Sequence, residues 1–209
     1  MNETSLFTGE SDDGTFVPFT DILFNALLGF AVMLFIAFAL IKPDDKVGNI
    51  NVKAEYLITV TWPDNLPDDI DTYVRDPQDN IVWYNTLDRG FLHLDRDDRG
   101  EYLDQVMVNG EMVTFPLNQE SVTLRGIIPG EYTVNVYNFL NASNQPVPVS
   151  VKVEKLNPTV KVIYYQSMTL MGVGDERTAI RFTLDEEGNV SNLNDIQDSL
   201  VEAVRAPRK

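Results

Sequence analysis

The sequence predicts a single transmembrane α-helix followed by a mainly-β domain, an antiparallel β-sandwich with one C-terminal amphipathic helix. One stretch, from Phe16 to Ile41, is almost wholly apolar. After it, short segments rich in β-forming residues recur at roughly ten-residue spacing, which is typical of a sandwich. The 209 residues therefore divide into an acidic tail (1–15), a transmembrane helix (16–41), a linker (42–51) and a β-sandwich domain (52–209).

The apolar stretch is long enough to cross a membrane. As a helix rising about 1.5 Å per residue, Ile22 to Ile41 spans the hydrocarbon core of about 30 Å. A signal peptide is the alternative, because Ala37-Phe38-Ala39 resembles a cleavage site. However, residues 1–20 contain no Lys or Arg, and the run exceeds the usual h-region of about 7–15 residues. We therefore expect an uncleaved single-pass anchor.

Asp21 is the candidate functional residue of this helix. A carboxylate in a membrane span is costly, and such residues usually face protein or a water-filled path. Asp21, Asn25 and Gly29 recur at a spacing that places them on one helix face, where a small residue permits close helix approach. Thr20 is a further polar neighbour. The alternative is that Thr20 and Asp21 merely cap the helix N-terminus.

Composition restricts partners and compartment. The net charge of −16 predicts a surface that repels nucleic acid and anionic headgroups. The absence of cysteine excludes disulfides and thiolate metal sites. Lys42 and Lys46 follow the helix, whereas the tail has no basic residue, so charge bias alone would place the N-terminus outside.

The β-domain is predicted from alternating segments and turn residues. Asn109-Gly110 is a strong hairpin signal, and residues 132–139 alternate as a strand with one buried face. The predicted strands are 54–62, 70–74, 81–84, 102–108, 111–115, 121–127, 132–139, 147–153, 160–165 and 178–184. Leu193, Ile196, Leu200, Val201 and Val204 then fall at helical spacing, which predicts one amphipathic helix ending before Pro207.

Other candidate sites are weaker. Acidic turns flank the second predicted strand, and oxygen-rich loops can bind calcium, although such turns are more often solvated. The residues concerned are Asp64, Asp68, Asp69, Asp71, Asp76 and Asp79. Asp95, Asp97 and Gly100 imitate part of a calcium loop, but Arg99 occupies a ligand position and the closing Glu is missing.

Enzyme chemistry has little support in this sequence. His93 is the only histidine, so no histidine-based triad or cluster is possible, and we expect neither an enzyme nor a cofactor. Tyr56, Trp62, Trp83 and Tyr84 are interpreted as core residues rather than a sugar-binding platform.

Residues 17–41 resemble the membrane helix of the ExbD, TolR and MotB type of motor subunit. Pro18-Phe19-Thr20-Asp21 matches the family's proline-apolar-x-aspartate opening, and Met33-Leu34-Phe35-Ile36 suits the apolar run that follows. The resemblance implies a homodimer inside a pentameric ring of a multi-pass ExbB, TolQ or MotA-type partner in a bacterial inner membrane. Asp21 would carry protons or sodium ions, and the N-terminus would be cytoplasmic, contrary to the charge bias. One helix offers few oxygens for sodium, which favours protons.

Two further segments resemble extracytoplasmic β-sandwich domains of the YfaP-like type. They are residues 62–85, with Asp69, Asp71, Val74 and Pro77 in a D-x-D-x-x-V-x-x-P signature, and residues 128–136. The peptidoglycan-binding module of MotB and the small α/β domain of ExbD and TolR are not visible. The leading hypothesis is thus an ion-driven motor subunit with a periplasmic sandwich of unknown target. The alternative is a membrane-tethered binding or adhesion module without ion transport.

Overall fold

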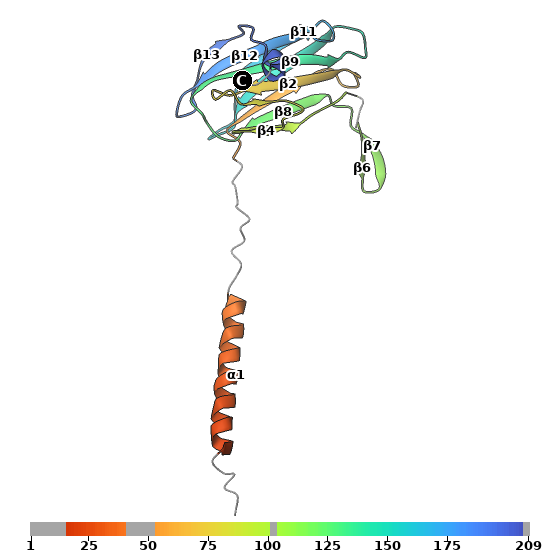
Figure 1. Cartoon of the computed structure of the whole chain (residues 1–209). Coiled ribbons are helices and arrows are strands. Elements are labelled where there is room, and N and C mark those ends of the chain that lie inside the picture. The colour runs from red at the N-terminus through yellow and green to blue at the C-terminus, as the bar shows by residue number, and fades with distance from the viewer. Residues whose placement is uncertain (1–15, 41–52, 101–103, 207–209) are drawn as a thin grey trace, which may run out of the picture. The chain divides into compact units, whose positions relative to one another are not determined.

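The computed structural model describes residues 16–40, 53–100 and 104–206 (Figure 1). The chain forms two compact units, Met1–Asn51 and Val52–Lys209. The predicted acidic tail and linker lie outside the described residues. We describe the helix and the β-domain separately.

The first unit contains a long apolar helix, α1 (Phe16–Leu40, 25 residues). Its segment Pro18–Phe38 has a mean hydropathy of 2.2, and none of it is buried against the rest of the chain. Within α1 no proline follows Pro18, so no proline interrupts its hydrogen-bond ladder. Its length and composition fit both a membrane span and a signal sequence.

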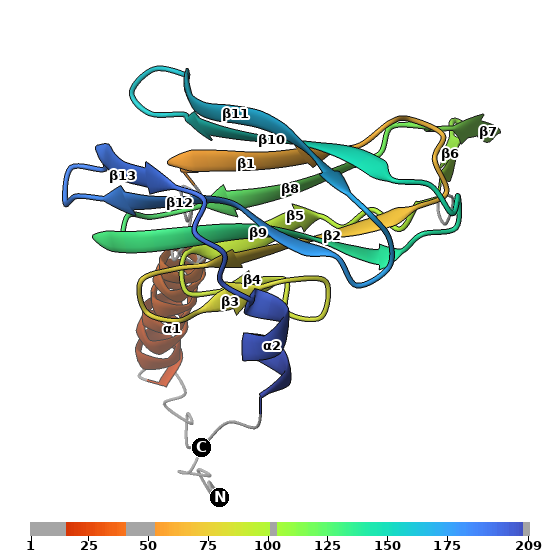
Figure 2. The ribbon, with the colours of Figure 1, turned by 90° about the horizontal axis from the view of Figure 1, so that it is seen from above.

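The second unit is a sandwich of two antiparallel sheets, which confirms the predicted fold class (Figure 2). The larger sheet has the order β11-β10-β1-β8-β5-β4, formed by Lys161–Leu170, Val147–Lys155, Tyr56–Thr61, Gln119–Leu124, Leu92–Arg96 and Asp88–Arg89. The smaller sheet has the order β13-β12-β9-β2-β3, formed by Val190–Asn194, Glu176–Leu184, Gly130–Leu140, Asp69–Arg75 and Ile81–Val82.

The main core lies between these two sheets because each strand directs alternate apolar residues inward. Val122 and Leu124 of β8 are fully buried, as are Ile58 of β1 and Val134 of β9. Phe182 stacks on Tyr132 with ring centroids 5.4 Å apart. This packing fixes the facing positions of β2 and β8, which matter for the site below.

The outer face of the smaller sheet carries a second, smaller core with the helix α2 (Leu200–Arg205). Leu200 and Val201 pack there with Tyr73 and Tyr137. The predicted amphipathic helix is therefore shorter than expected. Leu193 belongs to β13 and Ile196 is 65% exposed, so their helical spacing does not reflect a helix.

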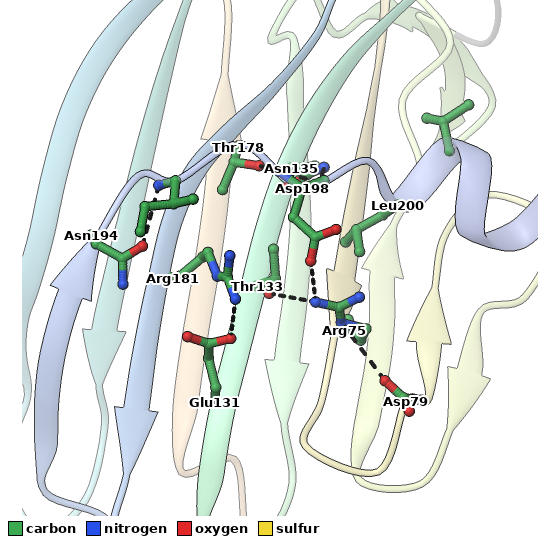
Figure 3. A network of polar contacts seen from close by, with 12 residues as sticks. Arg75, Asp79, Glu131, Thr133, Asn135, Thr178, Arg181, Asn194, Asp198 and Leu200 are labelled. Carbon is green, nitrogen blue, oxygen red and sulfur yellow. Dashed lines mark hydrogen bonds and ion pairs between the residues drawn. The ribbon is translucent and has the colours of Figure 1, made fainter.

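A polar network attaches the segment before α2 to the sheet (Figure 3). Arg75 of β2 donates to Asp198 and, at 3.3 Å, to Thr133 of β9. Asn135 of β9 donates to the backbone carbonyl of Asp198 at 2.7 Å. Arg181 of β12 pairs with Glu131 on the same face. Thr178 of β12 accepts from the Asp198 amide at 3.0 Å, so side chains from three neighbouring strands hold the C-terminal segment.

The remaining strands, β6 (Gln105–Val108) and β7 (Glu111–Thr114), form a separate hairpin whose residues are exposed (Figure 1). Asn109 and Gly110 both have positive φ, 51° and 88°. Such angles suit a tight two-residue hairpin turn, as the Asn-Gly pair predicts. The β6 strand is shorter than expected, and residues 101–103 lie outside the described part of the chain.

Candidate functional sites

Asp21 lies in the second turn of α1, because the helix begins at Phe16. A capping residue would precede the first helical position, where the backbone amides have no intrahelical partner. Neither Thr20 nor Asp21 stands there, so the structure does not support the capping interpretation. The carboxylate instead projects from within the regular helix.

The predicted polar face of α1 is fully accessible in the chain. Thr20, Asp21, Asn25 and Gly29 are all exposed. A Cβ atom added at Gly29 would meet nothing within 4 Å. Nothing in the described chain therefore requires glycine at this position, and any such requirement would have to come from a neighbouring molecule.

A cluster of carboxylates in the β-domain, Asp69, Asp71, Asp97 and Glu120, forms the second candidate site; we call it the carboxylate cluster. Asp69 and Asp71 come from β2, Glu120 from β8 in the opposite sheet, and Asp97 from the loop after β5. One ligand oxygen each of Asp71, Asp97 and Glu120 lies within 4.8 Å of the other two. Three segments distant in sequence thus place their acids together.

Glu120 reaches the cluster through the edge of β2. Strand β3 pairs only with Val74 and Arg75, which leaves the earlier residues of β2 without a strand on that side within the described chain. There the amide of Thr72 donates to Glu120 Oε2 at 2.6 Å. Glu120 is fully buried, and its other oxygen, Oε1, has no hydrogen-bond partner. The Glu120 carboxyl group thus accepts the hydrogen bond that a neighbouring strand would otherwise accept, and its second oxygen has no partner.

The two aspartates of β2 are almost as buried. Asp71 is 3% exposed and Asp69 is 9% exposed. Asp71 Oδ2 and Asp69 Oδ1 also lack a hydrogen-bond partner. Most buried polar atoms in proteins are satisfied, so three orphaned carboxylate oxygens in one place require an explanation.

Burial among like charges raises the pKa of Asp69, Asp71 and Glu120. Desolvation, with Asp97 adding repulsion, raises the pKa of Asp69 to about 6. Desolvation and the charges of Asp69 and Asp97 raise the pKa of Asp71 to about 8. For Glu120, desolvation dominates and places the pKa well above its ordinary value, although the Thr72 hydrogen bond acts in the opposite direction.

The loop after β5 positions Asp97 and opens the cluster to solvent. Gly100 has φ of +61°, and a Cβ atom there would lie 2.7 Å from the carbonyl oxygen of Pro67. Glycine therefore allows the loop to pack closely beside β2. Arg99 Nε donates to Asp97 Oδ2 at 3.1 Å. A cavity of about 230 Å³ adjoins the cluster, lined by Asp69, Asp71, Tyr84, Asp97, Arg99 and Phe139.

The other acidic residues of the β2 region divide into structural and solvated groups. Asp76 accepts from the amides of Gln78 and Asn80 and so closes its own turn. Asp68 is fully buried, with Oδ1 accepting from the amide of Ser143 at 3.0 Å. Asp64 and Asp79 are exposed, as expected of solvated turns. That expectation is wrong for Asp68, Asp69, Asp71 and Asp76.

Sequence reasoning did not identify Glu120. The predicted strand begins at Ser121, two residues after the observed start at Gln119, so it does not include Glu120. The available signal was the alternation with Val122 and Leu124, which places Glu120 on the buried face. The loop of Asp97 does not match a calcium loop by itself, and the acids that lie close to Asp97 come from β2 and β8.

Not all of the aromatic residues that were predicted to lie in the core are buried, and His93 lies at the surface. Tyr56 and Trp62 are buried, as predicted, and Trp83 packs partly buried on the second core. Tyr84 is 36% exposed and lines the cavity, so its assignment to the core is wrong. His93 lies beside Asp88, with its Nδ1 3.0 Å from a carboxylate oxygen at the domain surface.

Comparison with protein-family models, curated proteins and solved structures finds no match for the chain. The chain is therefore described as an N-terminal apolar helix followed by an antiparallel β-sandwich-like domain, without a family assignment.

Proposed function

We propose that the chain is a single-pass subunit of an ion-driven inner-membrane motor, in which Asp21 carries the transported ion. The observation that supports this most is the position of Asp21. It stands within a regular apolar helix of 25 residues, on the same face as Asn25 and Gly29. A residue that costs energy in a membrane usually has a role there.

In this proposal the N-terminus is cytoplasmic and the β-domain is periplasmic. Two copies of α1 lie inside a pentameric ring of a multi-pass protein of the ExbB, TolQ or MotA type. Gly29 permits close contact with a neighbouring helix, and Asn25 supplies a hydrogen bond across it. The periplasmic domain transmits the motion to an envelope target.

The driving step is neutralisation of Asp21 by a proton from the periplasmic side. An apolar environment disfavours the charged carboxylate, so the neutral form moves past the ring and the charged form does not. Release of the proton to the cytoplasm restores the charge. Each elementary charge that crosses 100 mV supplies about 2.3 kcal/mol, several times the thermal energy.

Purification of the tagged full-length chain from its native membrane tests the assembly. Native mass spectrometry of the detergent-solubilised complex should show two copies of the chain with a ring of one multi-pass protein. Recovery of the chain alone, or as a monomer, would contradict the proposal. Exchange of residues 16–40 for an unrelated apolar helix provides the matched control. If the helix is only a tether, this exchange should leave the composition of the complex unchanged. If it is a motor helix, the exchanged chain should no longer assemble with the ring.

A further inference from the structure

We propose that the carboxylate cluster of Asp69, Asp71, Asp97 and Glu120 is a divalent-cation site and that its ligand is Ca²⁺. The inference concerns the β-domain and is independent of the role of Asp21. It depends on the burial of the cluster, its orphaned oxygens and their spacing.

The cluster has more negative than positive charge within the described chain. Arg99 pairs with Asp97, and its charge also acts on Asp69 and Asp71. Arg96, the last residue of β5, donates to Asp98 at 2.8 Å and to the carbonyl of Leu117. One guanidinium thus faces four carboxylates. Buried charges in proteins are paired or bind metal ions, and a divalent cation would supply the missing charge.

The orphaned oxygens identify the ligand atoms. Glu120 uses Oε2 to hold the Thr72 amide, which leaves Oε1 free. Asp71 Oδ2 and Asp69 Oδ1 are likewise free and buried. These atoms come from facing strands of the two sheets, which are fixed by the core. The oxygens are therefore held in place before a cation arrives.

The donor set favours Ca²⁺. All donors are carboxylate oxygens, which are the ligands of hard cations. The three oxygens of Asp71, Asp97 and Glu120 lie within 4.8 Å of one another, so they can share one Ca²⁺ coordination sphere, whose opposite ligands are about 4.6–5.2 Å apart. Mg²⁺ normally keeps several waters and binds only one or two carboxylates, fewer than this cluster offers.

The cavity provides a path for the ion. It is lined by Asp69, Asp71 and Asp97, whereas Glu120 is fully buried and does not line it. Its volume of about 230 Å³ also leaves room for water molecules that complete the six to eight ligands of Ca²⁺. Tyr84 on the cavity wall supplies an optical reporter close to the ion.

Calcium titration of the full-length protein in detergent, after removal of metal with EGTA, tests the site. Isothermal titration calorimetry should show one Ca²⁺ per chain, and the melting temperature should rise with Ca²⁺ concentration. Tb³⁺, a luminescent substitute for Ca²⁺, should emit when tyrosine is excited, and added Ca²⁺ should abolish that emission. Glu120→Gln and Asp71→Asn should abolish all three responses. Asp79→Asn, which changes an exposed acid of the adjoining turn, should preserve them.

Each contrary result has a definite meaning. The proposal would be overturned if the wild-type protein showed no heat, no melting shift and no Tb³⁺ emission up to about 10 mM Ca²⁺. This concentration lies above the range of the weakest protein sites. Protons rather than a cation would then satisfy the cluster. An equal or stronger response to Mg²⁺ would overturn the choice of Ca²⁺. Because the wild-type measurements stand alone, a variant that fails to fold does not weaken the test.

Discussion

Replacement of Asp71 by Asn should stabilise the cation-free protein at neutral pH. Burial and the charges of Asp69 and Asp97 raise the pKa of Asp71 from 3.8 to about 8. The folded protein therefore holds this proton more tightly than the unfolded chain does. The stabilisation from this group is complete below about pH 4 and is lost as the pH rises toward 8. Asn removes the ionisable group while keeping nearly the same shape.

The magnitude follows from the pKa. At pH 7, about three pH units above the ordinary value, keeping Asp71 protonated costs about 4 kcal/mol at 1.36 kcal/mol per unit. Neighbouring acids share part of this cost, and the new amide adds an unsatisfied polar group worth about 1 kcal/mol. We expect a net stabilisation of about 2–3 kcal/mol, or a melting temperature higher by roughly 4–12 °C for a domain of this size.

Thermal unfolding of the full-length protein in EGTA measures this effect. The gain should nearly vanish at about pH 4.5, where protonating Asp71 in the folded state costs only about 1 kcal/mol and the unsatisfied amide of the variant offsets it. With Ca²⁺ present the order should reverse, because the wild type gains the binding energy and the variant does not. A variant that is less stable than the wild type at both pH values in EGTA would refute the reasoning. In that case the carboxylate would act as a structural hydrogen-bond partner.

Three other substitutions test separate parts of the structure. Gly29→Leu should lower co-purification with the ring protein by at least about tenfold. Ala31→Leu, which changes a residue roughly opposite on the helix, should leave co-purification unchanged. Equal effects of the two substitutions would argue against a specific contact face. Phe182→Ala should destabilise the β-domain by about 3–5 kcal/mol in urea titration, because the ring is fully buried and stacked on Tyr132. A loss of stability below about 1 kcal/mol would contradict that packing. Glu176→Ala should release α2 and speed proteolysis of the C-terminus, because the Glu176 carboxylate accepts from the first amides of the helix at 2.8 and 3.1 Å. An unchanged rate of cleavage would show that apolar packing alone holds α2.

Local patterns predicted much of the sandwich. The alternation of residues 132–139 corresponds to β9, and the Asn109-Gly110 turn corresponds to the β6–β7 hairpin. Strand β5, with the sequence Leu-His-Leu-Asp-Arg, was not predicted because only two of its residues are apolar. It forms because β8 pairs with it across the sheet. Such pairing depends on contact between distant segments, which the local β-propensity of a segment does not predict.

The sequence indicates only part of the carboxylate cluster. Asp69 and Asp71 are conspicuous as a pair, but their burial depends on β8 and on the loop that Gly100 turns toward β2. Glu120 is distant from them in sequence, so no linear spacing links it to the site. In contrast, Asp21 is recognisable from sequence alone, because the cost of a charge in an apolar helix is a local property.

Ion uptake by the reconstituted complex tests the central claim most directly. Proteoliposomes that contain the chain with its ring protein should take up protons when a membrane potential is imposed, as read by a pH-sensitive dye. Asp21→Asn should assemble with unchanged stoichiometry and lose this uptake, while Asp21→Glu should retain part of it. An assembled Asp21→Asn complex that takes up protons at the wild-type rate would contradict the assignment of Asp21 as the ion carrier.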